Sequence, residues 1–218
     1  MERNFSVWAD ELRAIGEESA PRVQKEKLNI FINDRFQNNM SAKDAELSDS
    51  MKRYSLYSMQ RYRTRYLLAK LTQFVDMAYK GLKVPGSLSE YTVLEIEHIL
   101  PDSPENALRA DFTAKNQIAD YDEYKIKLGN LTMLEKPINI VASNDFFAAK
   151  KAEYAKCKYY LTSSIAGLTA VGNNSSITRI NSKLAAYNEW TARNIDDRQG
   201  LLINLTREVW KIAPIEVE

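Results

Sequence analysis

Between Leu67 and Tyr79, apolar residues recur three and four positions apart, and this repeat is the strongest constraint on the fold. Such spacing places side chains on one face of an α-helix. Gly81 and Pro85 follow closely and predict its end. Gly16 is the only glycine among the first 80 residues. The sequence therefore predicts a helical lead-in over residues 1–88. The residues of the repeat are Leu67, Leu68, Leu71, Phe74, Val75, Ala78 and Tyr79.

Composition limits the class of protein. In a chain of 218 residues, 44% apolar residues and three tryptophans suffice for a core, which predicts one compact domain. A net charge of +1 indicates neither nucleic acid nor membrane by itself. A single cysteine, Cys157, excludes an intramolecular disulfide and a cysteine-based zinc cluster. Acids stand where a signal peptide needs apolar residues, and no run is long enough for a membrane span, so we expect a soluble, cytoplasmic protein.

Residues 89–160 have a different pattern. Tyr91 to Leu100 reads as a strand, and Ile126 to Leu134 as a second extended stretch, with a polar loop from Asp102 to Asp122 between them. Ser143-Asn144-Asp145 predicts the start of a helix over Phe146–Tyr154. Helix is predicted again from Ile180 to Trp210, within a C-terminal segment 161–218. The predicted fold class is mainly α with a small two-stranded element, that is, α+β.

The only histidine, His98, directly follows Glu97. A carboxylate is a hard oxygen ligand for a divalent metal, and a neutral imidazole can take a proton from water. Side chains alternate along a strand, so the two would point to opposite sides unless the chain bends there. They could then reach a metal and a water from different directions. The alternatives are a satisfied core histidine and a solvated strand glutamate.

Three segments carry a resemblance to a known family: Glu97-His98-Ile99-Leu100-Pro101, then Gly129-Asn130-Leu131-Thr132-Met133-Leu134, then Asn139 with Phe147-Ala148-Ala149-Lys150. In this order they resemble the HNH nucleases, whose fold is a ββα finger around one metal ion. More closely, they are similar to the C-terminal nuclease domain of GmrSD-type modification-dependent restriction enzymes. Trp190, Ile195, Arg198 and Trp210 also resemble the closing helices of that family.

The resemblance implies a metal-dependent DNA endonuclease acting in phage defence. His98 would be the general base, and Glu97 and Asn139 would hold Mg²⁺ or Mn²⁺, which suit an oxygen-only site. Asn130 would hold the imidazole ring or its loop. Lys150, with Lys151 beside it, would contact phosphate.

Each of these residues also has a structural interpretation. Asn130 after Gly129 is typical of a tight turn, and Asn139 could simply begin a helix. Asn144 fits an N-cap better than a ligand, although it is the second position where relatives carry a metal-binding histidine. The two lysines could be solvated. Asp102 stands where relatives often carry glutamine, and it could add an acid near the metal.

From Lys52 to Lys80 there are seven basic residues and only one acidic residue, and four tyrosines are interleaved with the basic residues. One interpretation is a basic face for phosphates with aromatic support, in which Arg61 and Arg65 bind nucleic acid. The other is a helix whose tyrosines pack inward and whose arginines are solvated. The tyrosines are Tyr54, Tyr57, Tyr62 and Tyr66.

Full-length enzymes of the resembling family also carry a nucleotide-hydrolysing sensor module. Neither its Asp-Gly-Gln-Gln-Arg-like motif nor a phosphate-binding Gly-x-x-x-x-Gly-Lys occurs here. We therefore expect a fragment of a longer protein or a subunit that works with a partner. Two rival functions remain, a catalytically inactive nucleic-acid-binding scaffold and a helical interaction domain.

Overall fold

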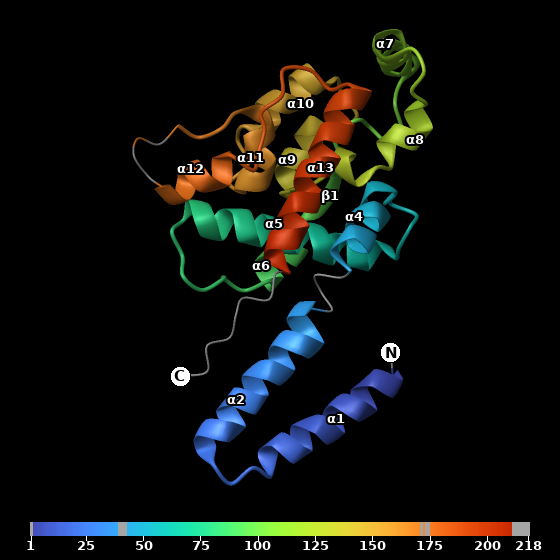
Figure 1. The fold of residues 1–218 in the computed structure, drawn as a ribbon. Coiled ribbons are helices and arrows are strands. Elements are labelled where there is room, and N and C mark those ends of the chain that lie inside the picture. Colours follow the sequence, from blue (N-terminus) through green and yellow to red (C-terminus); the bar gives the residue numbers. More distant parts are fainter. Residues whose placement is uncertain (1, 39–42, 171, 173–174, 211–218) are drawn as a thin grey trace. The chain divides into compact units, whose positions relative to one another are not determined.

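The computed structural model describes residues 2–38, 43–170, 172 and 175–210, drawn as a ribbon in Figure 1. The chain divides into two compact units, one of residues 1–50 with 210–218 and the other of residues 51–209. The predicted segment boundaries, after residues 88 and 160, both fall inside the second unit. Residues 1 and 211–218, at the outer ends of the predicted segments, lie outside the described residues.

The first unit is helical, as predicted for the start of the chain. Its helices are α1 (Glu2–Gly16), α2 (Pro21–Ile32), the π-helical turn η1 (Asn33–Gln37) and the beginning of α4 (Asp44–Lys52). Pro21 occupies the first turn of α2, where its missing N–H costs no hydrogen bond. Trp8 of α1 packs on Phe36 with ring centroids 5.4 Å apart. Arg35 forms an ion pair with Glu11 at 2.6 Å.

The second unit contains the two strands and the remaining helices. Its helices are α5 (Arg61–Tyr79), α6 (Ser89–Thr92), α7 (Asn106–Asn116), α8 (Tyr121–Lys125), the 3-10 turn η2 (Leu128–Asn130), α9 (Lys136–Ala142), α10 (Phe147–Tyr154), α11 (Tyr160–Ala166), α12 (Ser175–Asn181) and α13 (Ala192–Val209). Its strands are β1 (Glu95–His98) and β2 (Leu131–Leu134). The prediction of a mainly helical fold with a small two-stranded element is confirmed.

Helix α5 forms the centre of the second unit. Leu68, Leu71 and Val75 are fully buried, as the apolar repeat predicted. Gly81 adopts a φ of 63° just after the helix, a conformation that glycine adopts without strain. The helix packs against α11, α12, α13 and β2. The helix therefore shares the core with elements far along the chain.

The two strands pair antiparallel, with Glu97 opposite Thr132 and His98 opposite Leu131. Both are shorter than predicted, because α6 takes the start of the first extended segment and η2 the middle of the second. All four residues of β2 are buried, so the strand passes through the core with helices on its sides. The pairing places His98 at the end of β1, beside the turn that begins β2.

Two predicted segments differ in the structure. The polar loop predicted over Asp102–Asp122 contains α7 and the start of α8. Leu108 and Phe112 lie one turn apart on α7 and are buried. Two apolar residues among many polar ones make a weak helical pattern, so the sequence did not predict this helix. The helix predicted from Ile180 to Trp210 is interrupted, because residues 182–191 are not helical. There Trp190 is buried between Phe147 and Tyr187. No helix among the described residues is long and apolar enough to cross a membrane.

Candidate functional site

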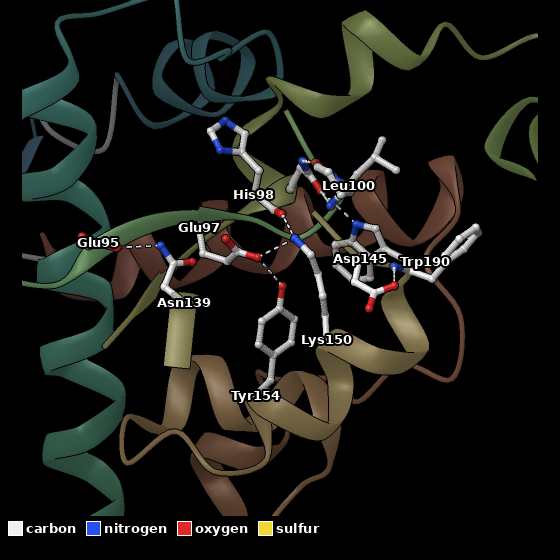
Figure 2. A network of polar contacts seen from close by, with 12 residues as sticks. Glu95, Glu97, His98, Leu100, Asn139, Asp145, Lys150, Tyr154 and Trp190 are labelled. Atoms are coloured by element: carbon white, nitrogen blue, oxygen red, sulfur yellow. Dashed lines mark hydrogen bonds and ion pairs between the residues drawn. The ribbon is translucent and has the colours of Figure 1, made fainter. Parts of the chain in front are cut away.

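His98 ends β1, and its imidazole points away from the side chain of Glu97 (Figure 2). The alternation expected of a strand is therefore present. The imidazole Nε2 is buried and has no hydrogen-bond partner among the described residues. Burial lowers the pKa of His98, and the positive charges of Lys150 and Arg61 lower it further against the opposing effect of Asp102. The ring is thus neutral at pH 7 and able to accept a proton.

Asn130 fixes the main chain just beyond His98. Its carboxamide oxygen accepts hydrogen bonds from the N–H of Leu100 at 2.6 Å and from the indole of Trp190 at 2.9 Å. Its amide nitrogen donates to the carbonyls of Leu100 and Lys125, both at 2.8 Å. Every bonding position of the side chain is used, and the residue is fully buried. Asn130 therefore holds the loop after His98 and not the ring itself.

The turn before β2 is held from behind by α13. The guanidinium of Arg198 donates to the carbonyls of Gly129 and Leu131, both at 2.7 Å. A Cβ added at Gly129 would lie 2.0 Å from the carbonyl oxygen of Ile195. The φ of Gly129 is not in the positive range, so its backbone conformation does not require glycine. Glycine is needed here because α13 approaches so closely. The sequence showed the Gly-Asn pair but gave no indication of this contact.

Glu97 forms a buried cluster with two residues of α10. The ammonium of Lys150 lies 2.7 Å from the carboxylate Oε1, and the hydroxyl of Tyr154 donates to the same oxygen at 2.8 Å (Figure 2). Lys150 also donates to the main-chain carbonyl of His98 at 2.7 Å. Lys150 is 1% exposed and Tyr154 fully buried, so the interpretation of Lys150 as a solvated lysine is wrong. Tyr154 had not been identified from the sequence, although its spacing of four residues from Lys150 places both on one helical face.

Asn139 lies in α9 and bonds to Glu95, not to Glu97. Its amide nitrogen donates to the carboxylate of Glu95 at 2.7 Å (Figure 2). Glu95 and Glu97 are two positions apart on β1 and therefore share a face of the strand. Asn139 thus lies on the same side as Glu97, opposite the ring of His98. The period of two could have identified Glu95 as a further oxygen donor of this face.

As placed, these residues do not form a metal site that includes His98. The charge of Glu97 is compensated by Lys150, and its Oε1 already accepts two hydrogen bonds. The described residues contain no group of three histidine, cysteine or acidic side chains arranged to hold a metal ion. On the far side of β1 from the imidazole, the carboxamide oxygen of Asn139 and one carboxylate oxygen each of Glu95 and Glu97 form no hydrogen bond with the described residues.

Asp102, just after the motif proline, contacts Lys125 of α8. Lys125 forms ion pairs with Asp102 at 3.3 Å and Asp122 at 3.1 Å. Both Lys125 and Asp102 influence the pKa of His98, in opposite directions. Asn144 is exposed and does not cap α10, whose N-cap is Phe146, so the N-cap interpretation is wrong. It makes no hydrogen bond with the described residues.

The basic residues of α5 have different environments. Arg61, at the start of the helix, is exposed and forms no hydrogen bond or ion pair within the described residues. The guanidinium of Arg65 instead donates to the carbonyls of Thr92 and Leu94, so it supports the approach to β1. Lys151 is partly exposed and donates to Asn188 at 3.1 Å.

Three of the four tyrosines near these arginines point outward. Tyr57, Tyr62 and Tyr66 are 76%, 63% and 45% exposed, and only Tyr54 is buried. The interpretation that these tyrosines pack inward is therefore wrong for three of them. Tyr57 precedes α5, and the other two tyrosines lie one turn apart on it, near the exposed Arg61 and Arg63. We call these five exposed residues the Tyr–Arg face.

A comparison with protein families matches residues 41–205 to the family described as GmrSD restriction endonucleases, C-terminal domain. The chain belongs to this family. No curated protein and no solved structure matches it.

The GmrSD C-terminal match contains every site residue described above, from Tyr57, before α5, to Arg198 in α13. It also contains nearly all of the second unit, whereas most of the first unit lies before it. The resemblance to the GmrSD C-terminal domain, inferred from three short segments, is therefore confirmed.

Proposed function

We propose that this GmrSD C-terminal domain hydrolyses phosphodiester bonds of DNA as an HNH-type endonuclease, with His98 as its general base. The observation that carries the proposal is the imidazole of His98, whose Nε2 has no partner and whose pKa is lowered mainly by burial. A histidine that served only to stabilise the core would use its nitrogens in hydrogen bonds. A general base that activates water must instead be neutral at the working pH and have a nitrogen free to accept the proton.

The order of elements supports the HNH assignment. His98 ends the first strand, Asn130 precedes the second, and helices α9 and α10 follow, which is the sequence of parts in a ββα finger. Asn130 bonds to the main chain of Leu100 and so fixes the loop that continues from His98. Its proposed role is to hold the base in its working position.

The Tyr–Arg face is the proposed contact with DNA. The positive charge of Arg61 is close enough to His98 to influence its pKa, which connects this face to the base. Exposed tyrosines can stack on bases and arginines can neutralise phosphates, so the two residue types together suit nucleic acid. Contacts by Lys150 and Arg65 would require them to leave the partners that they have here. Lys151, which is partly exposed, stays a candidate.

A requirement for Mg²⁺ or Mn²⁺ stays a prediction. Glu97 and Asn139 are the proposed ligands, with Asn144 and Asp102 as further oxygen donors. Glu97 would have to bind the ion while Lys150 shares its carboxylate, or else give up that ion pair. A divalent ion would neutralise charge that develops on the phosphate.

The wider biology is also a proposal. Restriction of foreign DNA in the cytoplasm is the expected role, because the matching family is one of restriction endonucleases. A nucleotide-hydrolysing sensor, on another chain or another part of the protein, would recognise the modified DNA.

The test is incubation of supercoiled plasmid with the purified chain and Mg²⁺ or Mn²⁺. Nicked or linear product should form with the wild type, and none should form with His98→Ala or with EDTA. Lys156→Met, which removes an exposed charge, is the control for preparation and folding. Equal cleavage by His98→Ala would disprove the assignment of the base. Salt-sensitive DNA binding without cleavage under any condition would favour the inactive scaffold.

A further inference from the structure

Among the described side chains, only that of Lys150 contacts both the carboxylate of Glu97 and the main chain of His98. Its ammonium lies 2.7 Å from Oε1 of Glu97 and 2.7 Å from the main-chain carbonyl oxygen of His98. Figure 2 shows the three groups converging on the side of β1 that faces α10. Tyr154, one helical turn after Lys150, completes the cluster through its hydroxyl. The helix thus holds both the side chain before the base and the carbonyl of the base.

The cluster is almost entirely removed from solvent. The side chain of Lys150 is 1% exposed and that of Glu97 8%. A buried ammonium is costly unless an acid and further acceptors compensate it, and both are present here. Burial lowers the pKa of Lys150, while Glu97 acts in the opposite direction. Burial and the nearby Glu97 carboxylate raise the pKa of Tyr154 well above its usual value, so its hydroxyl stays a donor.

The end of β1 is then anchored on two sides. On one side Lys150 holds the carbonyl of His98. On the other, the N–H of Ile99 donates to the carbonyl of Asn130 at 3.0 Å, and Leu100 is held by the Asn130 side chain. The imidazole extends from a residue whose carbonyl and following peptide are both fixed. Rotation of that peptide would move the ring, and small displacements of a catalytic group are costly.

We infer that Lys150, together with Glu97 and Tyr154, is a positioning clamp for His98, and that Lys150 is not a phosphate ligand. The catalytic consequence of the clamp rests on the proposed function. Its structural consequence does not, because the contact with the His98 carbonyl exists whatever the domain cleaves.

Two variants distinguish the loss of the contact with His98 from a general loss of stability. Lys150→Met removes the contact with His98 but leaves Glu97 as an unpaired buried carboxylate, which destabilises the fold. The double variant Glu97→Gln/Lys150→Met removes both charges, so it avoids that penalty and still lacks the contact. Lys156→Met is the matched control, because it removes an exposed lysine just after α10.

The first measurement is hydrogen exchange followed by NMR at the amide of Leu100, which lies at the anchored end of β1. In both variants the amide proton of Leu100 should exchange about ten-fold faster or more, since the strand end opens more often. Lys156→Met should match the wild type.

The second measurement is cleavage and DNA affinity in the double variant, compared with Glu97→Gln alone because Glu97 is itself a proposed metal ligand. The kcat for plasmid nicking should fall about ten-fold or more below that of Glu97→Gln, as expected for a displaced base. The Kd for DNA should stay within about two-fold of the wild type, since no phosphate contact is lost. A weaker Kd with unchanged kcat would identify Lys150 as a phosphate ligand and overturn the inference.

The two proposals can fail separately. If the wild type cleaves no DNA, the proposed function fails, and the exchange of the Leu100 amide still decides whether the clamp exists. If the folded double variant shows unchanged exchange at Leu100, the clamp is refuted, even where the wild type is an active nuclease.

Discussion

Asn130 bonds to both polar main-chain groups of Leu100, accepting from the N–H at 2.6 Å and donating to the carbonyl at 2.8 Å. These two hydrogen bonds join the turn before β2 to the chain two residues after His98. They leave Leu100 no freedom to rotate its peptide groups independently of the strand pair. The geometry at His98 therefore depends on a buried amide that never contacts the imidazole.

Replacing Asn130 by alanine should destabilise the domain. The N–H and carbonyl of Leu100 and the indole of Trp190 would be left buried without their partner. We expect a loss of about 3 kcal/mol in the free energy of unfolding, measured in urea, because several buried polar groups lose a partner together. Asn188→Ala, at an exposed site, should change it by no more than about 0.5 kcal/mol. Equal effects of the two changes would contradict the role of Asn130.

Two glycines should respond to alanine in opposite ways. Gly129→Ala places a Cβ 2.0 Å from the Ile195 carbonyl, so α13 must move away from the turn. We expect a loss of about 4 kcal/mol or more, or no folded protein. Gly200→Ala, within α13, meets nothing within 4 Å. There the free energy of unfolding should rise by about 0.5–1 kcal/mol, because alanine favours helix. Thermal melts of both variants give the comparison.

Activity should persist below the usual pKa of histidine. Burial lowers the pKa of His98, so its protonated form is reached only at a pH below about 6.5. Cleavage should fall as pH drops through that lowered pKa. An NMR titration gives the pKa of His98, and the pH–rate profile gives the midpoint of the loss of cleavage. The two values should agree.

The same pKa shift affects stability. The unfolded chain takes up the proton first as pH falls, so the contribution of His98 is fully present above about pH 6.5 and is lost as pH falls through the folded-state pKa. His98→Gln should remove this part of the pH dependence of unfolding. A rise in stability on acidification that depends on His98 would contradict the burial argument.

Arg61 and Arg65 should differ although they lie one turn apart. Arg61→Gln should weaken DNA binding and reduce the slope of log K against log salt by about 1, because one phosphate contact is lost. Arg65→Gln should instead destabilise the fold by about 1–3 kcal/mol, because the carbonyls of Thr92 and Leu94 lose their donor. Fluorescence anisotropy of labelled DNA with His98→Ala as background measures binding without cleavage. Equal loss of affinity in two stably folded variants would place both arginines at the DNA.

Tyr62→Ala tests the aromatic part of the Tyr–Arg face. Tyr62 is 63% exposed and lies under the guanidinium of Arg63. Affinity for single-stranded DNA should fall by about 1–3 kcal/mol if a base stacks on this ring, with the salt slope unchanged. Tyr57→Ala, on the same face, shows whether the effect extends to the second ring. No change in either variant would confine the contact to the arginines.

Local patterns were enough for part of this protein. The apolar repeat predicted α5, and Gly81 its end, because burial of one helical face and a positive φ are properties of nearby residues. Alternation along β1 correctly separated Glu97 from His98. The order of the three motif segments predicted the family. Where the pattern was weak, as in α7 with only Leu108 and Phe112 buried, the helix was missed.

What the sequence alone determined is therefore the helical class, the position of the one histidine and the family to which the chain belongs. The tertiary structure decided the partners. Lys150 is a buried counter-ion because α10 packs beneath β1, and Gly129 is a glycine because α13 passes over it. Arg65 supports a loop, whereas Arg61 stays exposed. Local sequence fixes periodicity and conformation over a few residues, but which side chains meet across 50 to 70 residues depends on the packing of whole elements.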